Sequence, residues 1–246
     1  TEIYTLSLHD ALPIFRQGNM IKAALFDLDG VVFDTESQYS IFWGMIGREY
    51  HPEMPDFEYR IKGQTLVQIY DKYFTDEAVF AHIEGFTGAK EEQAKITARL
   101  DEFEKTMQYE YIAGFEDFIT DLKQHGVKCA VVTSSNIQKM LNVYERHPEF
   151  KAYFDRVLTS EDFAESKPHP DCYLKGAAYF GVEPEDCVGL EDSFNGLKAV
   201  RASGAFTLGL ATTNSREAIQ PLSDYVVDDY RGFSFADLQR IVENAK

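Results

Sequence analysis

Short apolar runs alternate with amphipathic stretches along most of the chain after residue 20. The runs that end in turn residues predict buried strands, at residues 21–26, 128–133, 156–158, 187–190, 206–210 and 225–227. Between them, apolar residues recur at helical spacing and predict helices, at residues 115–122, 138–146, 171–180, 196–203 and 235–244. Alternation of strand and helix predicts an α/β fold with a parallel sheet and helices on both faces.

One long segment interrupts this alternation. Between residues 34 and 110 there is almost no strand-like run, and residues 90–108 carry Glu and Lys spaced three and four apart, as on a helix. A segment of this length is too long for a loop in a compact domain. We therefore expect a separate, mainly helical unit inserted after the first strand.

Composition and charge limit the classes of partner. The 246-residue chain has 44% hydrophobic residues and a formal net charge of −17, which is the composition of an acidic globular protein. Duplex nucleic acid and anionic membranes attract surfaces rich in Lys and Arg, so neither is expected as a partner. A small anionic ligand needs only a local cationic site and is compatible with this charge.

The first 19 residues differ from the rest of the chain. Residues 4–14 look like the translation of a sequencing adapter, so we expect residues 1–19 to be a non-native leader before a natural start at Met20; a short native helix is the alternative. Cys129, Cys172 and Cys187 form no CxxC motif, and we expect unpaired cysteines in a reducing, cytoplasmic compartment. No apolar run is long enough to predict a membrane span.

Acidic, hydroxyl and cationic side chains follow several predicted strands. The carboxyl ends of parallel strands meet at one edge of a sheet, which is where open α/β sheets bind ligands. We therefore expect these side chains to converge there as a metal-assisted phosphoryl-transfer site. In chain order they are Asp27, Asp29, Thr133, Lys167, Glu191 and Asp192.

The acidic residues suit the chemistry of such a reaction. The Asp27 carboxylate can attack phosphorus, while Asp29 can protonate the leaving oxygen and later take a proton from water. Carboxylates beside a phosphate require a cation. Asp192 and Glu191, with Asp27 and the Asp29 carbonyl, would provide hard oxygen ligands for Mg²⁺.

The remaining residues suit the binding of a phosphoryl group. Thr133 and the residues after it, including Ser134 and Asn136, lead into a predicted helix N-terminus, where amides and hydroxyls hold phosphate oxygens. Lys167 would supply positive charge to the phosphate and the nucleophile together.

Each signal alone has a structural explanation. Asp-Leu-Asp-Gly is a common turn composition, and residues 133–136 are an equally good helix cap. Lys167 is compatible with a solvated lysine before a helix, and Glu191-Asp192 with a favourable helix dipole. Four signals in order, each near the end of a predicted strand, favour the catalytic interpretation.

Together these motifs resemble the haloacid dehalogenase superfamily of phosphotransferases. The matching elements are Phe26-Asp27-Leu28-Asp29-Gly30 and the six residues after it, Thr133, Lys167, and the segment 189–196 with sequence Gly-Leu-Glu-Asp-Ser-Phe-Asn-Gly. The resemblance covers residues 20–246 and is greatest for the β-phosphoglucomutase-like branch. It implies a Rossmann-like core at 20–33 and 111–246, with a small all-helical cap inserted at 34–110.

The same resemblance implies roles for individual residues. Asp27 would be the nucleophile and Asp29 the general acid/base, and Asp27, Asp29, Glu191 and Asp192 would surround Mg²⁺. The dehalogenase members lack the second aspartate of the first motif. Asp29 therefore favours phosphoryl transfer over carbon–halogen chemistry.

The cap segment bears on the choice between a phosphatase and a mutase. Matched without gaps, the cap-side His and Arg of the family's mutases fall on Tyr39 and Leu66. Loss of the arginine removes a clamp for a second phosphate, so we predict a phosphatase. Compensation by Arg60 or Lys62 stays open, although both also suit a solvated surface. The cap residues expected to contact the substrate are Lys62, Gly63 and Gln64.

The sequence thus predicts a Mg²⁺-dependent phosphatase acting on small phosphorylated metabolites, with sugar phosphates expected, through an aspartyl-phosphate intermediate. A sugar phosphomutase and a catalytically idle binding domain are the alternatives. We expect a monomer.

Overall fold

Six parallel strands form one sheet in the computed structural model, which describes residues 21–62 and 64–245. The strand order is β3-β2-β1-β4-β5-β6. The strands are β1 (Ala23–Phe26), β2 (Lys128–Val132), β3 (Arg156–Leu158), β4 (Cys187–Glu191), β5 (Phe206–Leu210) and β6 (Tyr225–Val227). Every strand predicted from the apolar runs is present, which confirms the parallel α/β fold.

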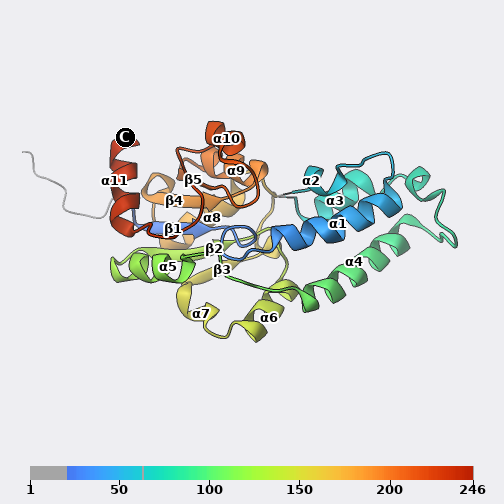
Figure 1. Ribbon diagram of the computed structural model, residues 1–246, viewed down its shortest axis with the longest axis horizontal. Helices are drawn as coiled ribbons and strands as arrows, with labels where there is room; N and C mark the ends of the chain where they lie inside the picture. The colour runs from blue at the N-terminus through green and yellow to red at the C-terminus, as the bar shows by residue number, and fades with distance from the viewer. Residues whose placement is uncertain (1–20, 63, 246) are drawn as a thin grey trace, which may run out of the picture.

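Helices cover both faces of the sheet because successive strand residues point to opposite sides. Ala24 and Phe26 pack against one apolar cluster, to which α5, α6 and α11 contribute, whereas Ala23 and Leu25 pack against α8 and α9 (Figure 1). The helices of this part are α5 (Phe115–Gln124), α6 (Ile137–Arg146), α7 (Phe150–Tyr153), α8 (Asp171–Phe180), α9 (Phe194–Ser203), α10 (Arg216–Ile219) and α11 (Phe235–Ala245), with short 3-10 turns η2 (Ser160–Asp162), η3 (Pro184–Asp186) and η4 (Gln220–Leu222).

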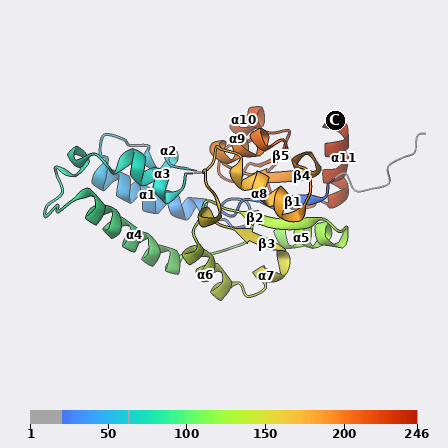
Figure 2. The same ribbon diagram turned by 180° about the vertical axis from the view of Figure 1, so that it is seen from behind.

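A helical insert, residues 36–106, lies between β1 and α5 and extends to one side of the sheet (Figures 1 and 2). It contains α1 (Glu36–Tyr50), α2 (Phe57–Arg60), α3 (Leu66–Tyr73), η1 (Glu77–Phe80) and α4 (Ala89–Thr106). Its apolar residues form a cluster of their own, which includes Phe57, Phe74 and Ile96. The predicted cap boundaries of 34 and 110 remain a prediction.

The two chain segments that join the insert to the sheet run side by side. The Asp34 amide donates to the Glu110 carbonyl at 2.8 Å, and Phe33 forms an antiparallel bridge with Tyr111. This pairing places the start of α1 and the end of α4 beside the loop that follows β1.

Predictions about the leader, the cap, the cysteines and membrane spans meet different outcomes. Residues 1–19, the suspected leader, lie outside the described residues, and so does Gly63. Cys129, Cys172 and Cys187 are buried and form no disulfide, as expected. No helix in the described part of the chain is both long and apolar enough to cross a membrane.

Candidate active site

The candidate site lies where β2, β1 and β4, the central strands of the sheet, end. Their register places Phe26 level with Val131 on one side and with Leu190 on the other, so the residues after them emerge together. Asp27 follows β1, Thr133 follows β2 and Glu191 is the last residue of β4. The parallel sheet therefore brings these three predicted residues to one edge.

Lys167 connects the two buried carboxylates at this edge. Its Nζ donates to Asp27 Oδ1 at 2.7 Å, to Glu191 Oε1 at 2.7 Å and to the Val132 carbonyl at 3.1 Å. The lysine is only 3% exposed, which is incompatible with the alternative of a solvated surface lysine. It arrives from the loop before α8, about 140 residues after Asp27 in sequence.

Burial and charge act in opposite directions on the pKa of Asp27. Removal of the carboxyl from water raises its pKa, and Glu191 and Asp29 raise it further, while Lys167 lowers it; the resulting pKa is about 7. Burial alone lowers the pKa of Lys167, but Asp27 and Glu191 outweigh that effect and raise it. Lys167 is therefore a permanent cation beside a carboxyl whose charge costs free energy.

Both carboxylate oxygens of Glu191 already accept several hydrogen bonds. Oε1 accepts from the Tyr173 hydroxyl at 2.9 Å as well as from Lys167. Oε2 accepts from the amides of Asp192 and Ser193 and from the Ser193 hydroxyl, at 3.1 to 3.3 Å. A Cβ on Gly196 would lie 1.9 Å from this carboxylate, so glycine is needed for α9 to begin so close. Glu191 thus holds Lys167 and the start of α9 in place.

Asp192, unlike Glu191, has a side-chain oxygen that accepts no hydrogen bond from the described residues. This oxygen, Oδ2, is buried. Burial, with Glu36 and Glu191 nearby, raises the pKa of Asp192 well above its ordinary value. Gly30, at φ 74°, leaves space beside it, since a Cβ there would lie 2.1 Å from Oδ2. An unpartnered carboxyl oxygen in a confined space is the feature expected of a metal ligand.

Three carboxylates are close enough to share a cation. One oxygen each of Asp27, Glu191 and Asp192 lie within 4.8 Å of one another. Hard oxygen donors of this kind suit Mg²⁺. These residues therefore fit the predicted ion, with Asp192 as the ligand that the hydrogen bonds leave most available. The Asp29 carboxylate does not belong to this cluster.

Asp29 instead turns toward three hydroxyl and ammonium donors. Thr35 donates to its Oδ1, Ser135 donates to its Oδ2 at 2.9 Å, and Lys139 contacts both oxygens. Thr35 directly precedes α1 of the helical insert, while Ser135 and Lys139 belong to the segment after β2. The first-motif aspartates, two residues apart, thus face different partners.

Two residues of the segment after β2, Thr133 and Asn136, use their side chains to stabilise the local backbone. The Asn136 side chain accepts from the Lys139 amide at 2.9 Å and caps α6, which is the structural alternative considered for this segment. Thr133 Oγ1 accepts from the Ser135 amide at 3.0 Å. Ser134 lines the pocket beside them. Substrate contact by Thr133, Ser134 and Asn136 remains a prediction.

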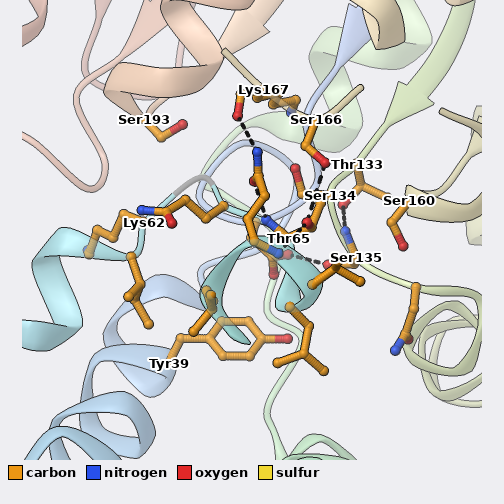
Figure 3. A pocket seen from close by; sticks show the side chains of 18 of the residues that line it. Tyr39, Lys62, Thr65, Thr133, Ser134, Ser135, Ser160, Ser166, Lys167 and Ser193 are labelled. Atoms are coloured by element: carbon orange, nitrogen blue, oxygen red, sulfur yellow. Dashed lines mark hydrogen bonds between the residues drawn. The ribbon is translucent and has the colours of Figure 1, made fainter. Parts of the chain in front are cut away.

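A pocket of about 550 Å³ separates this edge from the helical insert. Figure 3 shows Thr133, Ser134 and Ser135 on the side of the sheet and Lys62, Thr65 and Tyr39 on the side of the insert. Lys62 lies 3.3 Å from Glu36. Gln64 also lines the pocket.

Hydrogen bonds join the insert to the sheet side at the pocket rim. Gln68 Nε2 donates to the Lys167 carbonyl at 3.4 Å, and the Ser166 hydroxyl donates to Thr65 Oγ1 at 3.3 Å (Figure 3). Asn195 donates to the Lys62 carbonyl at 3.3 Å. The insert therefore lies over the carboxylate edge and forms one wall of the pocket in front of Asp27.

Sequence reasoning missed Lys139 and Glu104, which are buried near Asp29 on either side of the half-buried Tyr39. Lys139 packs over the Tyr39 ring at 4.4 Å, and the Tyr39 hydroxyl donates to Glu104 at 2.7 Å. Burial raises the pKa of Tyr39 and of Glu104. The only signal available was a lysine on the amphipathic helix 138–146, where a lysine ordinarily faces solvent.

The fold and site define a class: a Rossmann-like α/β enzyme with a helical insert over a centre of carboxylates and two buried lysines. A family model for haloacid dehalogenase-like hydrolases matches residues 21–204. The chain belongs to this family.

Individual relatives include both phosphatases and mutases. Beta-phosphoglucomutase of Bacillus subtilis (strain 168) is 28% identical over 196 residues, which cover 77% of this chain and 83% of that protein. Hexitol phosphatase B of Escherichia coli (strain K12) is 26% identical over 195 residues, covering 74% and 80%. The crystal structure of beta-phosphoglucomutase from Clostridium difficile matches with a TM-score of 0.69 at 22% identity, covering 91% of this chain and 98% of that one. The chain is thus similar to β-phosphoglucomutase-like members of the family, and the structural match shows the fold.

Proposed function

We propose that the protein is a Mg²⁺-dependent phosphatase that hydrolyses small phosphorylated metabolites, with sugar phosphates as the expected class. The observation that carries the proposal is the buried Asp27–Lys167–Glu191 arrangement at the edge of a pocket of about 550 Å³. A carboxylate held by a permanent cation in front of a cavity is suited to attack an electrophile bound there.

The reaction would proceed in two displacements. An Asp27 oxygen forms a bond to phosphorus as the bond from phosphorus to the leaving oxygen breaks, and Asp29 donates a proton to that oxygen. Water then attacks phosphorus, Asp29 takes its proton, and the bond to Asp27 breaks to release inorganic phosphate. Lys167 stays charged throughout and offsets the negative charge that accumulates around Asp27.

Mg²⁺ would be held by Asp27 and Asp192 with the main-chain carbonyl of Asp29, and it would supply charge stabilisation to the phosphoryl oxygens. Glu191 was also predicted as a ligand. Because its two oxygens accept from five donors, we assign it the task of holding Lys167 beside the ion.

Hydrolysis is favoured over a mutase reaction by the charges in the pocket. Lys62 is the only Lys or Arg that the described part of the insert contributes to the lining, and Glu36 already pairs with it. Arg60, the other candidate for binding a second phosphate, pairs with Asp56 and does not line the pocket. A substrate with one phosphate and an uncharged polyol body fits this lining better than a bisphosphate.

Compartment and assembly complete the proposal. Burial raises the pKa of the Cys129 thiol to about 12, so this cysteine is unreactive and suits the reducing cytoplasm. We propose a monomer, because both the carboxylates and the covering insert belong to one chain. No nucleic acid or membrane partner is proposed.

The test is incubation with a panel of sugar monophosphates and Mg²⁺, followed by phosphorus NMR, with Asp27→Asn as the control. Release of inorganic phosphate by the unmodified protein alone supports the proposal. Formation of a positional isomer of the substrate would instead establish a phosphomutase. This is the alternative function, because the B. subtilis relative is named beta-phosphoglucomutase. Ligand-induced stabilisation without any reaction would establish a binding domain.

A further inference from the structure

Lys139 on α6 is a buried cation to which the proposed reaction assigns no role. Its side chain is 1% exposed, and its Nζ lies 2.5 Å from Asp29 Oδ2 and also contacts Oδ1. A lysine so completely removed from water is stable only when paired, and Asp29 is the carboxylate it pairs with.

Lys139 contacts more of the Asp29 carboxylate than the other two donors do. Thr35 donates to one carboxylate oxygen and Ser135 to the other, at 2.9 Å for Ser135. Lys139 contacts both oxygens and is the only charged donor of the three. Hydrogen bonds between charged groups are stronger than those from hydroxyls, so the lysine dominates the orientation of the carboxylate.

The helical insert closes the other side of this lysine. The Tyr39 ring of α1 lies 4.4 Å from Nζ, and the Tyr39 hydroxyl donates to Glu104 of α4 at 2.7 Å. Lys139 is not among the residues that line the pocket. An effect of Lys139 on the reaction therefore passes through a neighbouring side chain, and Asp29 is the neighbour that takes part in the proposed reaction.

We propose that Lys139 is the positioning residue that orients Asp29 for its proton transfers. Proton transfer requires the carboxyl group within hydrogen-bond reach of the reacting oxygen, and a small misplacement is costly in rate. This inference rests on the acid–base role of Asp29 in the proposed function. The alternative is that the ion pair only stabilises the fold.

A double-mutant cycle between Lys139 and Asp29 separates these possibilities. The four proteins are the unmodified enzyme, Lys139→Met, Asp29→Asn and the double variant, all assayed with p-nitrophenyl phosphate and Mg²⁺. This substrate has a good leaving group, so residual turnover stays measurable without the acid. Lys22→Met is the matched control, since Lys22 pairs with Asp186 at 2.6 Å at the opposite end of β1.

Positioning predicts a specific pattern of rates. Lys139→Met should lower kcat by about 10- to 100-fold while KM changes less than about threefold, because the lysine does not line the pocket. In the Asp29→Asn background the same substitution should change kcat less than about twofold. Lys139→Arg, which keeps a charged donor, should recover most of the lost kcat, and Lys22→Met should match the unmodified enzyme.

Two results would overturn the inference in distinguishable ways. If Lys139→Met lowers kcat by the same factor with and without the Asp29 carboxylate, the lysine acts independently of Asp29 and only this inference fails. If Asp29→Asn keeps full kcat, the acid–base role in the proposed function fails together with it. Should Lys139→Met not fold, Lys139→Gln supplies a neutral side chain with a donor, and the same cycle applies to it.

Discussion

Burial of the Asp27 carboxyl predicts that Asp27→Asn stabilises the metal-free protein at neutral and alkaline pH. The side chain is 9% exposed, and burial is the largest effect raising its pKa from 3.8 to about 7, against the opposing effect of Lys167. An asparagine has nearly the same shape, and its amide oxygen can still accept from Lys167. The substitution therefore removes the costly charge and keeps the packing.

The size of the effect follows from proton linkage. A group whose folded-state pKa is raised adds full stability below its unfolded pKa, and that stability is lost as pH rises through the folded pKa. Asp27 thus favours folding fully below pH 3.8 and loses this contribution as pH approaches 7. At about 1.4 kcal/mol per pKa unit, the shift corresponds to about 4 kcal/mol in total, of which about 3 kcal/mol falls between pH 5 and pH 8.

Urea unfolding in EDTA at pH 5 and pH 8 measures this contribution. The free energy of unfolding of Asp27→Asn, minus that of the unmodified protein, should increase by about 3 kcal/mol from pH 5 to pH 8. Asp186→Asn is the control, because Asp186 pairs with Lys22 away from the site, and it should show no such increase. Addition of Mg²⁺ at pH 8 should raise the free energy of unfolding of the unmodified protein more than that of Asp27→Asn, because the ion binds the carboxylate in the folded state.

A constant difference between the two proteins from pH 5 to pH 8 would refute this reasoning. It would mean that the Asp27 carboxyl titrates alike in the folded and unfolded chains. The interpretation of Asp27 as a buried carboxyl, with a pKa that burial raises and Lys167 partly lowers, would then be wrong.

Other predictions concern the metal ligands and the close approach of α9. Asp192→Asn should weaken Mg²⁺ binding, measured by titration calorimetry, by about tenfold or more, because Asp192 Oδ2 has no hydrogen-bond partner in the described part of the chain. An equal loss in Glu191→Gln would contradict the different roles assigned to the two residues. Gly196→Ala should lower the free energy of unfolding, measured with urea, by about 1–3 kcal/mol, because the alanine Cβ would clash with the Glu191 carboxylate. The same clash should reduce turnover. An unchanged urea midpoint would contradict this prediction. Removal of Mg²⁺ with EDTA should abolish phosphate release, and added Mg²⁺ should restore it; full activity in EDTA would contradict the metal requirement.

The central strands β1 and β4 were predictable because all of their residues are buried. A buried parallel strand is a short continuous apolar run ended by polar or turn residues, and this signal is local in the sequence. β3, β5 and β6 have the residue bounds that their apolar runs predict. The carboxylate edge was predictable for a related reason, since parallel register brings residues after neighbouring strands together.

The orientation of side chains at that edge was not predictable in the same way. Asp27 and Asp29 are two residues apart, yet one faces Lys167 and the other faces Lys139. Lys139 is buried because Tyr39, a hundred residues earlier in the chain, packs over it. That contact depends on where the insert lies against α6, and no local pattern encodes it. Asn136 shows the converse, since its capping of α6 follows from the residues around it.

The proposed reaction requires that Asp27 forms a bond to phosphorus during turnover. The enzyme is mixed with Mg²⁺ and a phosphomonoester that it hydrolyses, quenched rapidly and reduced with borohydride. The reduction converts an aspartyl phosphate to homoserine, and peptide mass spectrometry then locates the homoserine in the sequence. We expect homoserine at position 27 in the unmodified enzyme and none in Asp27→Asn. Turnover without homoserine at position 27, or with the phosphoryl group found on another residue such as Thr133, would contradict it.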